Sequence, residues 1–160
     1  HMAIKGLLDP ILRFPVNMVN AAYIAKDRGI AVSETTTGES AGYKNLLTMK
    51  VTTDSSELVI AGSVLYKGGA RIVSIAGYTM DMVPEGAVII SRHLDRPGVI
   101  GRASTILGEH QINIAGMQVG RFHPGEEAIM VLNVDGDVPE EVMEAIRSMP
   151  GIYSAKFARI

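Results

Sequence analysis

An apolar run at residues 87–93, followed by a Pro97-Gly98 turn, constrains the fold of this chain more than any other feature. Its length and apolar content predict a strand buried in a sheet, and the spacing of apolar residues after the turn predicts a helix. A second strand is expected to begin at Asn113. A strand, a sharp turn and a helix N-terminus gather backbone N–H groups and polar side chains at one place, which suits a small anion or an amino acid.

The sequence after the Pro84-Glu85-Gly86 turn follows one order of strands and helices. The apolar patterns predict strands at residues 87–93, 113–122, 126–134 and 152–159 and helices at 97–109 and 138–149. The resulting βαββαβ order is the ferredoxin-like pattern. We therefore expect a domain boundary at this turn, near residue 86.

The first half of the chain predicts a different arrangement within the same α+β class, an antiparallel sheet with helices. Helical patterns precede a short strand and a polar, glycine-rich loop, which are expected in this order at residues 3–13, 18–28, 30–34 and 35–42. Gly29 is expected to end the second helix. Three strand-like runs follow, at residues 45–52, 57–66 and 70–75. Short turns separate them, so the sheet is expected to be antiparallel.

Composition narrows the functional classes. With a formal net charge of −2, the chain lacks the basic excess of a nucleic-acid-binding surface, so no nucleic-acid partner is expected. The sequence contains no Cys, which excludes disulfides and zinc–thiolate sites. Its His residues do not form a cluster with other ligand residues, so no metal site is expected. No apolar run reaches the length of a membrane span, so we expect a soluble cytoplasmic protein with no membrane partner.

Two runs in the second half carry a family resemblance, Asp95 to Gly101 and Ile112 to Arg121. They resemble an ACT domain, and more narrowly the C-terminal ACT domain of the D-3-phosphoglycerate dehydrogenase family. Three runs in the first half are similar to the intervening, or allosteric substrate-binding, domain that precedes ACT in the longer members: residues 16–22, 25–30 and 71–78. The resemblance implies an intervening domain at residues 3–86, truncated at its start, and an ACT domain at 87–160.

The resemblance implies a regulatory fragment that is not an enzyme in its own right. No Gly-x-Gly-x-x-Gly motif for a dinucleotide occurs, so NAD is expected in the parent dehydrogenase and no cofactor is expected here. Such fragments pair as a homodimer through the ACT domain and bind L-serine, or a related amino acid, at the dimer interface. Binding there gives feedback inhibition of serine biosynthesis. Pairing of dimers into a tetramer stays open.

Carried over position by position, the effector site implied by the resemblance includes His93, Asp95 and Asn113. Asp95 would accept from the ligand's ammonium group, and Asn113 offers a donor and an acceptor. The N–H groups near Gly98 and Val99 would face the carboxylate. Asp95 and Asn113 also fit a plainer role, as residues that cap and turn the backbone. No residue is expected to be catalytic.

Arg71 is a second candidate, for an anion, because members that bind an anion in the intervening domain carry a basic cluster on this strand and turn. Tyr78, Thr79 and Val83 stand where other members carry His or Arg, and a single Arg on a sheet is more often a solvated side chain. Two other functions stay open. One is the β portion of an iron-sulfur L-serine dehydratase, which would need its cluster elsewhere, and the other is a stand-alone ACT amino-acid-binding module.

Overall fold

The computed structural model describes residues 2–65 and 68–160. The chain forms two compact units, one that ends at Ser40 and one that begins at Ala41. The strand end expected at Tyr66, and Lys67 in the turn after it, lie outside the described residues.

The first unit contains two short helices, α1 (Met2–Leu8) and α2 (Ala21–Asp27). α1 ends before Pro10, because the proline ring lacks an N–H and clashes with the preceding turn of a helix. The apolar side chains of the unit pack into one small core, formed by Leu8, Val16, Ala21, Ile24 and Ala25.

The strand expected at residues 30–34 is wrong, because these residues form no strand and are exposed. The N–H of Ile30 donates to the Ala25 carbonyl at 2.9 Å and thereby closes the end of α2. Gly29, with a φ of +70°, makes this Schellman cap possible, and its role as the helix stop is confirmed. A strand also needs a neighbour for its backbone hydrogen bonds, and none of the described strands pairs with this segment.

The second unit begins with a sheet in the order β1-β2-β3-β4, and every neighbouring pair is antiparallel as predicted. Its strands are β1 (Leu47–Thr52), β2 (Glu57–Leu65), β3 (Gly69–Ile75) and β4 (Tyr78–Met82). β4 is a strand beyond the three predicted. Ile60 lies opposite Ile75, and Ile75 lies opposite Tyr78. These side chains therefore share one apolar face of the sheet.

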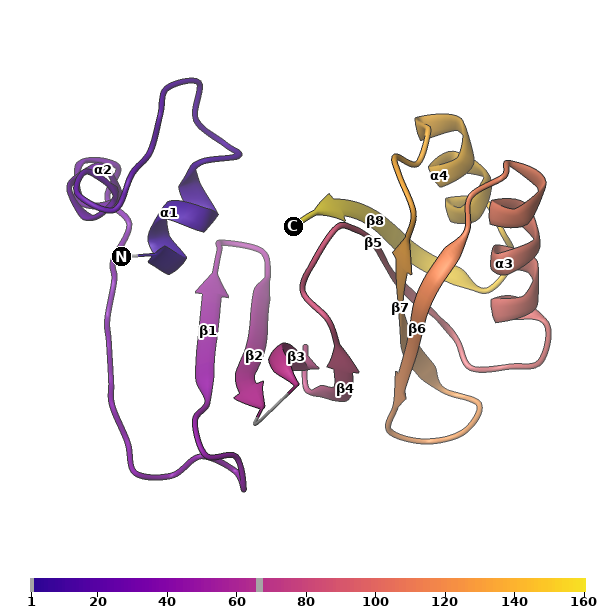
Figure 1. The fold of residues 1–160 in the computed structure, drawn as a ribbon, viewed down its shortest axis with the longest axis horizontal. Coiled ribbons are helices and arrows are strands. Elements are labelled where there is room, and N and C mark those ends of the chain that lie inside the picture. The colour runs from indigo at the N-terminus through magenta and orange to yellow at the C-terminus, as the bar shows by residue number, and fades with distance from the viewer. Residues whose placement is uncertain (1, 66–67) are drawn as a thin grey trace. The chain divides into compact units, whose positions relative to one another are not determined.

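The rest of the second unit has the predicted βαββαβ order: β5 (Ala87–Leu94), α3 (Val99–Glu109), β6 (Ile114–Arg121), β7 (Glu127–Val134), α4 (Glu140–Arg147) and β8 (Ile152–Arg159). The strands form a second sheet in the order β6-β7-β5-β8, with every neighbouring pair antiparallel. Figure 1 shows α3 and α4 together on one face of this sheet. The α+β class and the ferredoxin-like arrangement are confirmed.

The central strands of the second sheet, β5 and β7, are buried on both faces. On one face Ile89 and Leu132 pack against the two helices. On the other face Val88 and Val131 pack against the apolar face of the first sheet, where they contact a cluster that includes Met82 of β4. Strands that are covered on both faces carry apolar residues at consecutive positions. This double coverage explains the continuous apolar run at the start of β5, which the sequence analysis read as a buried strand.

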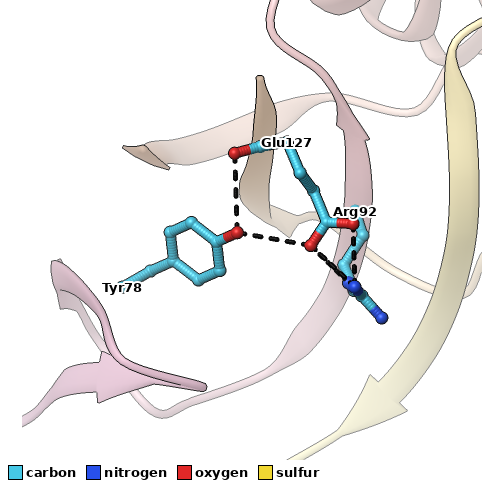
Figure 2. A network of polar contacts seen from close by, with 3 residues as sticks. All are labelled: Tyr78, Arg92 and Glu127. Atoms are coloured by element: carbon cyan, nitrogen blue, oxygen red, sulfur yellow. Dashed lines mark hydrogen bonds and ion pairs between the residues drawn. The ribbon is translucent and has the colours of Figure 1, made fainter. Parts of the chain in front are cut away.

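The two sheets approach most closely where β4 crosses β6. A Cβ atom placed on Gly120 would lie 2.9 Å from the Tyr78 Cβ, so this contact requires glycine. The Tyr78 ring packs on Phe122, with ring centroids 4.4 Å apart. Its hydroxyl lies 3.3 Å from Oε1 of Glu127, and Arg92 donates to both oxygens of the same carboxylate at 2.7–2.9 Å (Figure 2). The contact between the sheets is therefore packed and hydrogen-bonded.

Candidate ligand site at the end of β5

His93 lies near the end of β5, and only 1% of its surface is exposed. It faces the helices, because side chains alternate along a strand and Ile89, four residues earlier, packs against them. Neither ring nitrogen has a hydrogen-bond partner among the described residues, and the buried hydroxyl of Ser91 on the same face also has none. Burial lowers the pKa of His93 and outweighs the opposing effects of the Asp95 charge and of the Ser91 backbone, which does not come within hydrogen-bonding geometry of the ring. At pH 7 the neutral ring therefore offers one free donor and one free acceptor.

Asp95 follows β5 directly and forms an ion pair with Arg121, whose Nη1 lies 3.0 Å from Oδ2. The N–H of Asp95 donates to the Glu126 carbonyl at 2.7 Å, which holds this backbone against the turn between β6 and β7. The hydrogen bond from Arg121 is the largest cause of a lowered Asp95 pKa, and burial opposes it. The carboxylate is therefore charged at neutral pH and can accept from a cation.

The turn after Asp95 brings the N-terminus of α3 to the same end of the sheet. Gly98 has a φ of +91°, a left-handed conformation that favours glycine, and no side chain caps the helix. The N–H of Val99 lies 3.4 Å from the Arg96 carbonyl, and the Val99 side chain is buried. Gly98 and Val99 therefore contribute backbone groups at a helix end that favours negative charge.

Asn113 lies at the opposite end of the same sheet. The strand register places its neighbour Ile114 level with Ala87 at the start of β5, whereas His93 is six residues further along. Six residues of a strand span about 20 Å at 3.3 Å per residue. Nδ2 of Asn113 donates to Oδ2 of Asp135 at 2.8 Å. A single chain therefore does not bring Asn113 to His93.

Arg121 belongs to the His93 end of the sheet, and the sequence analysis did not single it out. It pairs with Ala128 of β7, which in turn pairs with His93 of β5, so the three residues form one row across the helix face. Alternation could have placed Arg121 on the same face of β6 as Met117 and Val119. Its ion pair with Asp95 could not have been found in this way, because it depends on how β6 and β7 lie against β5.

Arg71, the second candidate, lies on β3 of the first sheet. Its Nε is 3.1 Å from Oδ1 of Asp81, and its Nη1 donates to the carbonyl oxygens of Gly68 and Ala70. Three acceptors of the chain itself therefore surround this guanidinium.

Within residues 2–65 and 68–160, no group of three or more His, Cys, Asp or Glu side chains gathers where a metal ion could bind. In those ranges, no helix combines the length and the apolar character that crossing a membrane requires. The chemistry present at the end of β5 is hydrogen bonding and charge pairing.

A ferredoxin-like sheet, with polar groups gathered where its first strand meets a helix, is the architecture expected of an ACT domain. Residues 87–151 match the ACT domain family, which assigns the second sheet and its two helices to this class of regulatory domain. Residues 1–76 match the D-3-phosphoglycerate dehydrogenase intervening domain.

Individual relatives agree with these two matches. The chain is 45% identical over 149 residues to the D-3-phosphoglycerate dehydrogenase of Methanocaldococcus jannaschii, which covers 93% of the chain and 28% of that protein. It is 40% identical over 153 residues to the Bacillus subtilis D-3-phosphoglycerate dehydrogenase, covering 96% of the chain and 29% of that protein. The chain belongs to the D-3-phosphoglycerate dehydrogenase family and comprises its intervening and ACT domains. It spans less than a third of the length of these relatives.

Proposed function

We propose that this chain is the regulatory part of an NAD-dependent D-3-phosphoglycerate dehydrogenase, and that L-serine or a related amino acid binds at the His93 end of β5 and inhibits the enzyme by feedback. The observation that carries the proposal is the buried His93 ring beside the charged Asp95, because neither of its nitrogens has a hydrogen-bond partner among the residues that the structure describes. An unpartnered buried polar atom costs about 1–3 kcal/mol. A ligand that hydrogen-bonds to the ring recovers part of this cost.

The groups at this end match the three polar groups of L-serine. Asp95 accepts from an ammonium, and His93 offers a donor and an acceptor to a hydroxyl. Arg121 and the N–H groups at the start of α3 both favour a carboxylate. An amino acid without a hydroxyl would leave the His93 ring less satisfied, which supports a hydroxylated ligand.

In this proposal a second copy of the chain supplies Asn113. β6 lies at an edge of the second sheet, where Met117 and Val119 are 39% and 40% exposed. Pairing β6 antiparallel with the β6 strand of a second copy sets the start of one strand beside the end of the other. Asn113 of the partner subunit then comes to the Arg121 end, near His93. A homodimer of this kind has one continuous sheet and two equivalent sites, and it leaves room for pairing into a tetramer.

The domain limits and the parent protein are part of the same proposal. The intervening domain spans residues 3–86 and the ACT domain 87–160. The attached catalytic part is an NAD-dependent oxidoreductase of serine biosynthesis in the cytoplasm. Feedback requires that L-serine bind one arrangement of the whole enzyme more tightly than another. An anion at Arg71 would have to compete with Asp81 for the guanidinium.

Calorimetric titration of the dimer with L-serine tests the proposal. We expect the wild type to bind one ligand per chain. In Asn113→Ala the affinity for L-serine should fall by about tenfold or more, because hydrogen bonds to charged groups contribute about 1.5–3 kcal/mol. D-Serine, which carries the same groups in mirror arrangement, is the control ligand. If neither protein binds L-serine while sedimentation shows both to be folded dimers, the proposal is wrong.

A further inference from the structure

Arg121 and Asp95 place opposite charges side by side at the proposed effector site. Their closest atoms are 3.0 Å apart, and the side chains are 55% and 18% exposed, respectively. Arg121 also lies in the row across the sheet that includes His93, whose buried ring nitrogens have no hydrogen-bond partner in the described part of the chain. A positive group and a negative group that pair with each other therefore lie at the same end of the sheet as the buried His93 ring.

The guanidinium of Arg121 keeps most of its hydrogen-bonding capacity. It has five N–H donors, and its one polar contact among the described residues is the bond from Nη1 to Asp95. Arg92, on the other face of the same sheet, differs because its Nε and Nη2 bind both oxygens of Glu127. Arg92 is therefore already paired as a carboxylate receptor, whereas Arg121 can still receive a second carboxylate.

The N-terminus of α3 is the other positive feature at this end. It is equivalent to about half an elementary charge, and the N–H of Val99 already lies 3.4 Å from the Arg96 carbonyl. A guanidinium carries a full charge and can bind a carboxylate through two parallel N–H groups. Arg121 is therefore the stronger receptor for a ligand carboxylate.

On the basis of the function proposed above, we propose that Arg121 binds the carboxylate of the amino-acid effector while Asp95 binds its ammonium group. The ion pair holds the two receptors side by side, and the two charged groups of an α-amino acid are also close together because they share one carbon atom. Arg121 is then the residue that determines specificity for amino acids over simple amines.

Titration with L-serine and with ethanolamine, which is L-serine without its carboxylate, tests this assignment on the folded dimer. We expect the wild type to prefer L-serine by about tenfold or more, because a charge-assisted contact is lost with ethanolamine. In Arg121→Gln this preference falls to within about twofold, through weaker binding of L-serine. Arg121→Met, which keeps a long side chain without charge, is a second variant with the same expected result.

Arg92→Gln is the matched control, because Arg92 is 56% exposed on the same sheet and pairs with a carboxylate of the chain. It is expected to keep the wild-type preference. If both Arg121 variants retain the preference for L-serine, the assignment is overturned and effector binding stands. If the wild type binds neither compound, the proposed function fails and the assignment fails with it.

Discussion

Arg92 and His93 are neighbours on β5 and face opposite sides of the same sheet, but only Arg92 has partners for its polar atoms. Arg92 donates to both oxygens of Glu127, which also accepts from Tyr78 of the first sheet (Figure 2). His93 is almost fully buried, and neither of its ring nitrogens finds a hydrogen-bond partner in residues 2–65 and 68–160. Native structures pair nearly all buried polar groups, and the exceptions call for an explanation. The face that carries Arg92, called the completed face below, holds the two sheets together. The face that carries His93 still has polar atoms to which a ligand can add hydrogen bonds.

The largest effect is expected from breaking the completed face with Gly120→Ala. The new Cβ would lie 2.9 Å from the Tyr78 Cβ and 3.1 Å from Cγ2 of Ile129, so β4 must move away from β6. Overpacking of this kind costs about 1–3 kcal/mol, which urea unfolding measures. Gly116→Ala is the control on the same strand, because its nearest atom, Oδ1 of Asn133, is at an ordinary 3.6 Å. Equal losses from both substitutions would show that the contact at Tyr78 is not tight.

A smaller effect of opposite sign is expected from His93→Leu. Replacing an unpartnered buried polar ring by an apolar side chain should raise the free energy of unfolding by about 1 kcal/mol. The same change should abolish L-serine binding in the calorimetric titration. Ser91→Ala is the control, because it removes the other unpartnered buried atom on this face and should keep L-serine binding. A His93→Leu protein that still binds L-serine would remove His93 from the site.

The smallest effect is expected from pH. The pKa of His93 in the folded protein lies below the free value of 6.5, so the unfolded chain takes up this proton first as the pH falls. Stability should therefore fall between pH 7 and pH 6, by at most about 0.7 kcal/mol from this group. His93→Leu should lack that part of the fall in urea unfolding at the two pH values. The lowered pKa of Asp95 adds a separate loss only at more acidic pH, as its carboxylate becomes protonated. Identical pH slopes in both proteins would contradict this account of His93.

Most elements of the fold could be predicted from local sequence. The βαββαβ order and the antiparallel first sheet follow from apolar periodicity and turn residues, and both are confirmed. The error at residues 30–34 has a physical cause, because a strand exists only where another strand accepts its hydrogen bonds. β4 was not predicted, although its buried and exposed residues alternate, and it is a strand because its backbone pairs with β3.

The candidate site, like the fold, could be predicted from the sequence only in part. The amino-acid sequence by itself placed His93, Asp95 and Gly98 close together, because a strand, a short turn and a helix follow one another along the chain. Only the tertiary structure decided that His93 lacks partners, that Arg121 pairs with Asp95, and that Asn113 lies at the far end of the sheet. Local periodicity and turn chemistry act over a few residues. Strand register and burial depend on segments that are distant in the sequence, and they settle which side chains meet.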